Sequence, residues 1–179
     1  MLMQTGSGAT EAAMNALTKR RGFTLVELMI VIAVIAVLTT ISVPSLFYNM
    51  ADYKLNGTVR AIFATLQYAR MCAASAGKEY RVRFFLDNDP QGYRLEQGNY
   101  FNGSDRWTAR RDYHPLPEQV WINHATDYQG THQSGTSIIA FNPQGTASSG
   151  GVYLKNSKGK LRSVKVSSST GRIRIENSW

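Results

Sequence analysis

The longest apolar stretch lies near the N-terminus of the chain and carries no charge over 24 residues, from Leu28 to Ala51. As an α-helix, such a stretch rises about 36 Å, enough to cross a hydrocarbon core of about 30 Å. Basic residues at positions 19–21 precede it, and few charges follow it closely. We therefore expect one membrane-spanning segment, with a cytoplasmic N-terminus and the remaining chain on the other side.

After Asp52 the apolar residues take the spacing of an amphipathic helix. They recur every three or four residues, as one buried helix face requires. Gly77 is a suitable helix end, and Pro44 removes a backbone donor and is expected to kink the helix. The sequence predicts one helix from Phe23 to about Ala76, apolar in its first half, whose second half buries Leu55, Val59, Ile62, Phe63, Leu66, Ala69 and Ala73.

Beyond Gly77 the pattern changes to the alternation of half-buried strands. Turn residues separate the expected strands, and residues 98–117 predict an irregular loop because they are rich in Gly, Asn, Asp and Arg. One helix followed by antiparallel strands indicates an α+β domain. The expected strands are 80–86, 93–97, 118–123, 137–141, 151–155, 161–167 and 172–176.

One carboxylate, Glu27, stands near the start of the apolar segment. A charge at the centre of a membrane helix costs about 2.5–3.5 kcal/mol, and a buried carboxylate needs a buried cation as its partner. Cleavage after Gly22 would create such a cation, the α-amino group of Phe23. In a stack of subunits, this amine could meet Glu27 of the neighbouring subunit.

The run Gly22-Phe23-Thr24-Leu25-Val26-Glu27 resembles the processing site of type IV prepilins. The resemblance implies that a prepilin peptidase cuts after Gly22 and methylates the new amine of Phe23, and that Glu27 guides assembly. A plain signal anchor is the alternative. The expected organisation is a cleaved leader over residues 1–22, a transmembrane and filament-core half-helix over 23–50, and a periplasmic globular domain over 51–179.

Three short motifs in the second half resemble the GspH/FimT family, at residues 67–70, 141–145 and 171–173. This family holds minor pilins of type IV pili and minor pseudopilins of type II secretion. It implies a pilin fold with small antiparallel sheets packed on the long helix, an inner-membrane location before assembly, and other pilins as partners at or near a filament tip. Residues 171–174 also resemble the Gly-Arg-x-Arg tail of the DNA-uptake branch.

The positive charge of the expected mature chain lies entirely beyond Asp127, because acidic and basic residues balance between Phe23 and Asp127. One-sided charge favours a polyanion such as DNA. Arg172 and Arg174 are expected on one exposed strand face, with Ile173 and Ile175 turned inward. The alternative is a solvated basic sheet edge that resists aggregation. The candidate DNA-binding residues are Lys155, Lys158, Lys160, Arg162, Lys165, Arg172 and Arg174.

No pattern of catalytic or metal-binding residues emerges from the sequence. The three histidines lie in loop-like sequence without ligand spacing, and Cys72, the only cysteine, excludes an internal disulfide. We expect no enzyme activity, cofactor or metal. The leading hypothesis is a minor type IV pilin that binds DNA for uptake in natural transformation. The alternatives are a type II secretion pseudopilin and a minor pilin that primes pilus assembly without binding DNA.

We expect the mature chain to begin at N-methylated Phe23, because Gly22 and Phe23 form the predicted peptidase site. Mass spectrometry of the membrane-extracted protein should find an N-terminal peptide that starts at Phe23 and carries one added methyl group. Cells without the peptidase are the control and should retain the leader. An N-terminal peptide that keeps earlier residues in peptidase-positive cells would contradict this prediction.

Overall fold

The computed structural model describes residues 22–177, apart from the side chains of residues 41–48. The predicted leader, up to residue 21, lies outside the described residues. The first element is the helix α2, Leu25–Ala76. It is preceded by Thr24, whose Oγ1 accepts a hydrogen bond from the N–H of Glu27 at 3.1 Å, as an N-cap does. Gly77 follows its last residue with φ of 64°, a conformation that glycine adopts without strain.

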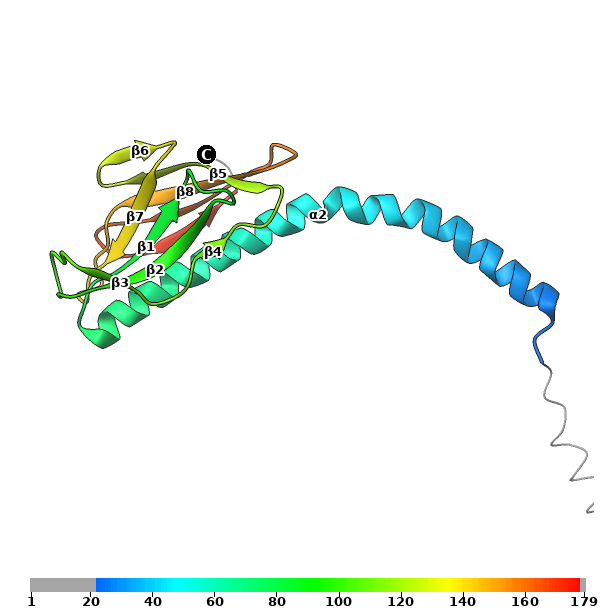
Figure 1. The fold of residues 1–179 in the computed structure, drawn as a ribbon, viewed down its shortest axis with the longest axis horizontal. Helices are drawn as coiled ribbons and strands as arrows, with labels where there is room; N and C mark the ends of the chain where they lie inside the picture. The colour runs from blue at the N-terminus through cyan, green and yellow to red at the C-terminus, as the bar shows by residue number, and fades with distance from the viewer. Residues whose placement is uncertain (1–21, 178–179) are drawn as a thin grey trace, which may run out of the picture. The chain divides into compact units, whose positions relative to one another are not determined.

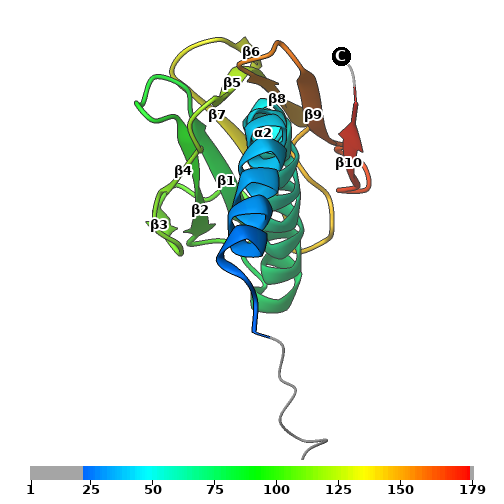
Figure 2. The same cartoon turned by 90° about the vertical axis from the view of Figure 1, so that its right-hand side faces the viewer.

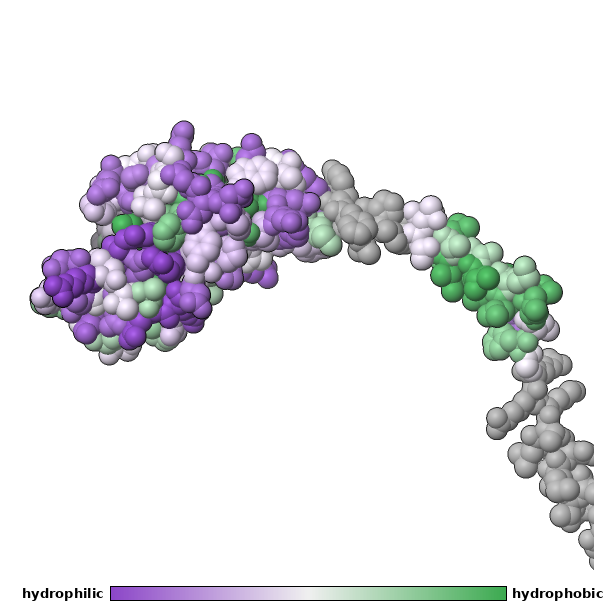
Figure 3. All heavy atoms as spheres, viewed as in Figure 1, coloured by the Kyte–Doolittle hydropathy of each residue, from purple (hydrophilic) through white to green (hydrophobic). Residues whose placement is uncertain are grey.

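The chain divides into two compact units between Leu46 and Phe47. In the first unit, the described residues 22–40 are all exposed, and apolar side chains dominate the start of the helix (Figure 3). Within the described residues, no helical segment combines the length and the apolarity needed to cross a membrane. Pro44, where a kink is predicted, lies among residues 41–48, whose side chains are outside the described part of the structure. The predicted domain limits at residues 23, 50 and 51 remain predictions.

The second unit contains two antiparallel sheets (Figure 1). In the first sheet the strand order is β3-β2-β1-β7, with β4 also paired to β2; in the second it is β10-β9-β8-β5-β6. The first sheet comprises β1 (Tyr80–Phe85), β2 (Gly92–Gly98), β3 (Trp107–Ala109), β4 (His114–Pro115) and β7 (Thr136–Phe141). The second comprises β5 (Val120–Asp127), β6 (Gly130–His132), β8 (Gly150–Asn156), β9 (Leu161–Val166) and β10 (Ile173–Glu176).

The second half of α2 packs into the core that both sheets share. Figure 2 looks along this helix, with β2 and β4 on one side and β9 and β10 on the other. The predicted helix face is buried, except that Phe63 is only partly buried. The inner faces of the sheets complete the core with fully buried side chains that include Phe84, Phe141, Leu95, Ile139, Leu154 and Val164.

One stretch predicted to lack regular structure contains two strands, and one predicted strand is longer than expected. The expected loop 98–117 includes β3 and β4, which are three and two residues long and show no alternation. Both exist because they pair with β2, where Glu96 lies opposite Ala109 and Tyr93 opposite His114. The predicted strand 118–123 continues to Asp127 as β5. A register shift between Ile122 and His124 hides this continuation, because it interrupts the alternation.

Asp127 ties the second sheet to the first. Its side chain is only 3% exposed, and one carboxylate oxygen lies 2.9 Å from Nε2 of His132 in β6. The other oxygen accepts hydrogen bonds from the Ser137 hydroxyl at 3.3 Å and from the N–H of Ile138 at 3.2 Å, both in β7. Burial by itself would raise the pKa of Asp127, but the hydrogen bonds from His132 and from the backbone of Gln129 and Ile138 outweigh it, so the pKa is lowered.

We expect Asp127→Asn to lower the free energy of unfolding by about 1–3 kcal/mol at pH 7, because buried donors lose a charged acceptor. A lowered folded-state pKa gives stability that is present above the unfolded value of about 3.9 and lost as the pH falls through the folded pKa. The difference between wild type and variant should therefore shrink below about pH 4. Urea unfolding of the detergent-solubilised chain at several pH values measures this.

The exposed Asp112→Asn is a matched control for the loss of one carboxylate. It should leave both the stability and its pH dependence close to wild type. If the stability difference between wild type and Asp127→Asn persisted unchanged at low pH, the ionised carboxylate could not be its cause.

Candidate functional site

The predicted cleavage site lies in an accessible, irregular segment. Gly22 and Phe23 precede α2 without regular structure, and Phe23 is 80% exposed. A protease must bind its substrate in an extended form, so this local structure suits cleavage after Gly22. The basic pair before Gly22 lies outside the described residues.

Glu27 occupies the first turn of α2, where the helix dipole favours a negative charge. Its side chain is exposed, and it makes no ion pair with any residue that the structure describes. A carboxylate on an apolar helix surface without an intramolecular partner is available to a group of another subunit. The α-amino group expected on Phe23 is the complementary cation.

The seven predicted DNA-binding residues do not share one surface. Lys155, Lys165 and Arg174 point from the outer face of the second sheet, because they alternate with buried neighbours and Arg174 lies opposite Lys165 in the register. Arg162 lies opposite the buried Leu154 and therefore takes the inner face. The other three lie outside the strands: Lys158 and Lys160 in the β8–β9 turn, and Arg172 before β10.

Two of these lysines are engaged in ion pairs. Nζ of Lys160 lies 3.0 Å from Asp52, and Nζ of Lys165 lies 2.6 Å from Glu176. Asp52 also accepts a hydrogen bond at 2.7 Å from the fully buried Asn156. The hydrogen bond from Lys160 is the main cause of the lowered pKa of Asp52. Lys160 thus joins the β8–β9 turn to α2, a structural role that a count of charges does not reveal.

Arg172 and Arg174 are exposed, and neither makes an ion pair within the described part of the chain. Their predicted exposure is confirmed, but the predicted common strand face is wrong, because Arg172 precedes β10 and only Arg174 lies in it. Ile173 is buried as predicted. Ile175 lies opposite Val164 and so faces inward, but it stays 41% exposed because a shallow depression beside Asn56 and Arg162 leaves it uncovered.

The loop before β10 is held against α2. Nη2 of Arg70 donates a hydrogen bond to the carbonyl of Thr170 at 3.1 Å. Gly171 has φ of 58°, and a Cβ at this position would lie 2.6 Å from the carbonyl oxygen of Gly145. A larger residue cannot fit this close approach, so Gly171 fixes where Arg172 leaves the loop.

The structure also reveals an arginine cluster that the sequence analysis missed. On the outer face of the first sheet, Glu96 accepts hydrogen bonds from Arg81 at 2.6 Å and from Arg94 at 2.7 Å, and Nε of Arg83 lies 3.5 Å away. Burial opposes ionisation of Glu96, but these arginines outweigh it and lower its pKa. The alternation of Arg81 and Arg83 was visible in the sequence, whereas their pairing with Glu96 depends on strand register.

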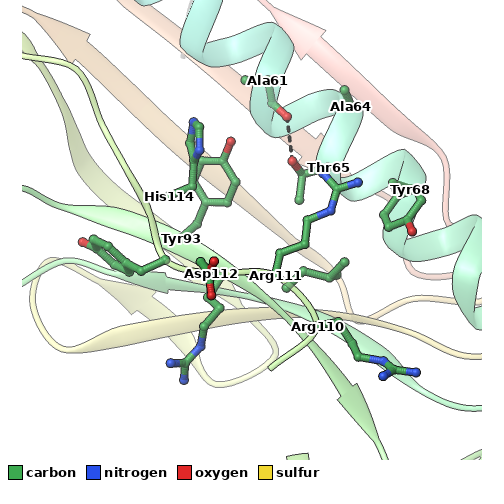
Figure 4. Close-up of a pocket in the computed structure, with 12 residues that line it drawn as sticks. Ala61, Ala64, Thr65, Tyr68, Tyr93, Arg110, Arg111, Asp112 and His114 are labelled. Carbon is green, nitrogen blue, oxygen red and sulfur yellow. Dashed lines mark hydrogen bonds between the residues drawn. The ribbon is translucent and has the colours of Figure 1, made fainter. Parts of the chain in front are cut away.

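A second feature that the sequence analysis missed is a groove of about 870 Å³ between α2 and residues 110–114. We call it the arginine groove. Figure 4 shows Ala61, Ala64, Thr65 and Tyr68 on its helix side, and Arg110 and Arg111 opposite them. The guanidinium carbon of Arg111 lies 4.3 Å from the centre of the Tyr68 ring.

The histidines and acidic residues of the described chain form no cluster of three or more that could hold a metal ion. The three histidines lie in separate places. All three were expected in loops, but His114 lies in β4, His124 in β5 and His132 in β6. His124 stacks on Tyr153 with ring centres 4.2 Å apart. His132 pairs with Asp127, and the ring of His114 lies 5.0 Å from that of Tyr93.

Comparison with protein families gives two matches. The model described as Type II transport protein GspH matches residues 58–171, and the model described as the prokaryotic N-terminal methylation motif matches residues 17–43. A comparison with curated proteins gave no match.

Two solved structures are similar to this chain. The type IV minor pilin FimU of Pseudomonas aeruginosa has 16% identity and a TM-score of 0.50, with 72% of this chain and 92% of FimU covered. The minor pseudopilin EpsH from the type 2 secretion system of Vibrio cholerae has 12% identity and a TM-score of 0.49, with 68% and 95% covered. At this identity, the likeness to FimU shows the fold alone, and it confirms the predicted pilin fold.

We expect Glu27→Ala to leave membrane insertion intact or improved, because a charge that is costly in hydrocarbon is removed. The same change should reduce recovery of the chain in sheared filaments, because the amine of a neighbouring subunit loses its partner. Immunoblots of membrane and filament fractions measure both quantities. Glu118→Ala, which removes an exposed carboxylate from the second unit, is the control. Normal recovery of the Glu27 variant in filaments would exclude the pairing.

Proposed function

Since the chain belongs to the family of type II transport protein GspH and carries a prepilin methylation motif, we propose that this pilin-like subunit is a minor type IV pilin that binds DNA. In this proposal, its N-terminal segment holds it in the inner membrane, with the C-terminal domain in the periplasm, until it joins the filament at or near the tip. Its role is structural and adhesive, without catalysis, metal or cofactor.

The methylation motif implies two kinds of partner, a prepilin peptidase and other pilins in a filament. The irregular segment around Gly22 suits the peptidase, and Glu27 is placed to pair with a neighbouring subunit. In this proposal, Gly22 acts before assembly and Glu27 during it. Neither residue occupies the surface of the second unit, which stays available for other partners.

The observation that carries the DNA proposal is the exposure of Arg172 and Arg174 without ion pairs in the described chain. Arginine suits phosphate because its guanidinium offers paired donors in a fixed plane. Lys155 adds positive charge on the same outer face as Arg174, whereas Lys160 and Lys165 form ion pairs with Asp52 and Glu176, and Arg162 donates a hydrogen bond to the carbonyl of Asn177. Such a surface reads no base edges, so binding should be sequence-independent and strongly dependent on salt.

The family match also favours a second function, that of a minor pseudopilin in a type II secretion system. A pseudopilin would use the same processing site and Glu27 but would not need exposed arginines before and within β10. A third possibility is a minor pilin that primes assembly without binding DNA, which would not need the exposed arginines either. The neighbouring genes discriminate between these roles, since a secretion operon favours the pseudopilin.

We expect the double variant Arg172→Gln, Arg174→Gln to lower the DNA affinity of the full chain in detergent. Each lost phosphate contact should reduce the log–log salt slope by about 0.7–0.9. Because both side chains are exposed, the stability change should stay within about 0.5 kcal/mol. Fluorescence anisotropy with duplex DNA at several salt concentrations, beside a thermal melt, measures these effects.

The matched control is Lys78→Gln with Arg106→Gln, which removes the same charge from exposed positions elsewhere in the second unit. It should leave affinity and salt slope nearly unchanged. In cells, the arginine variant should lower natural transformation while filament assembly continues. Equal affinity and salt slope for the two double variants would refute the DNA-binding proposal.

A further inference from the structure

The arginine groove has the chemistry of a peptide-binding site. We propose that it binds an extended acidic segment of a neighbouring filament subunit. This inference uses the subunit character of the family but not the DNA-binding proposal, and it concerns a different surface of the second unit.

The floor of the groove is apolar and shallow on the helix side. Ala61 and Ala64 lie about one turn apart on α2 and present only methyl groups (Figure 4). Leu95 of β2 also lines the groove and adds apolar surface. Small side chains allow another backbone to approach the helix closely. A volume of about 870 Å³ lies within the range of specific binding pockets, about 300–1,000 Å³, and can admit a few residues of an extended chain.

The rim of the groove is positively charged. Arg110 and Arg111 are exposed and make no ion pair with any described residue, whereas Arg94 is neutralised by Glu96. Stacking on Tyr68 holds the guanidinium of Arg111 in place, so little side-chain entropy is lost when its N–H groups bind a carboxylate. Among the described residues that line the groove, Asp112 is the only acidic one. The charge of the rim therefore complements an acidic ligand.

A peptide fits these features better than duplex DNA does. DNA offers phosphates to the arginines but no aliphatic groups to the floor that the two alanines form. An acidic peptide offers both, with carboxylates toward the rim and apolar side chains toward the floor. Subunits in a filament lie in permanent contact, so even a weak site of this kind is filled at high effective concentration.

The groove is separate from the predicted DNA-binding loop. Tyr68 faces the groove, whereas Arg70, two residues further along α2, contacts Thr170 in the loop before Arg172. Two residues correspond to a turn of about 200° around a helix. The groove and the loop thus lie on opposite sides of α2, and substitutions can test each one alone.

The test uses the full chain in detergent and two fluorescein-labelled peptides, (Glu-Leu)4 and (Gln-Leu)4. We expect the wild type to prefer the acidic peptide, and Arg110→Glu with Arg111→Glu to weaken its binding about tenfold or more through lost charge-assisted contacts. Arg106→Glu is the charge control, because Arg106 is exposed but does not line the groove. Ala64→Trp should also weaken binding, since it fills the groove without changing the charge.

Asp112→Asn should strengthen binding of the acidic peptide about two- to fivefold, the effect of removing one like charge at the surface. In cells, the double arginine variant should be depleted from filaments while the Arg106 variant is retained. Duplex DNA should bind the groove variants normally. Thermal melts establish that each variant is folded.

Equal binding of both peptides by the wild type, or unchanged peptide binding by the double variant and by Ala64→Trp, would overturn the proposal. A groove variant that loses duplex DNA but keeps the peptide would identify a nucleic-acid surface instead. Normal filament incorporation despite lost peptide binding would show that the occupant is not a filament subunit. These results are independent of the outcome at Arg172 and Arg174.

Discussion

The second unit depends on the burial of one stripe of α2 between two sheets. Neither sheet covers the stripe alone, because β2 and β4 of the first sheet lie on one side of the helix and β9 and β10 of the second lie on the other (Figure 2). Leu55, Ile62 and Leu66 are fully buried, so each loses its entire apolar surface to the core. The two sheets need fixing relative to each other, and this is what the Asp127 hydrogen bonds to β7 provide. The sites described above are arranged around this shared helix, with the arginine groove on one side and the loop before β10 on the other.

The helix and most strands were predictable because their patterns are local. The spacing of Leu55, Val59 and Ile62 indicates a helix without knowledge of its partners, and the alternation from Tyr80 to Phe85 indicates a strand in the same way. The short strands β3 and β4 were not predictable, since they exist only through pairing with β2. The arginine groove follows from those two strands, because their pairing with β2 and the hydrogen bond from the N–H of Arg110 to the carbonyl of Leu95 hold the chain between them beside the helix. No local pattern in residues 98–117 indicates this.

The candidate DNA-binding residues illustrate a different limit of sequence reasoning. A count of charges treats the seven basic residues as equivalent, whereas in the fold they lie on different surfaces and two of them form ion pairs. Asp52 lies more than a hundred positions before Lys160 in the sequence, and no local pattern links the two. Alternation did predict the exposure of Arg172 and Arg174, because Arg172 directly precedes and Arg174 occupies an edge strand whose Ile173 is buried in the core. The exposure of side chains could thus be predicted from the sequence, whereas ion pairs between distant residues could not.

The contact between Arg70 and the loop before β10 gives this fold a mechanical property. The hydrogen bond from Arg70 to the carbonyl of Thr170 joins the long helix directly to the loop that presents Arg172. Gly171, pressed against Gly145, prevents the loop from sliding along the helix surface. Tension applied to the helix would therefore reach Arg172 by two routes, through this hydrogen bond and through β10, which follows Arg172 and pairs with β9. A ligand held at this loop would therefore load the long helix as well as the second sheet.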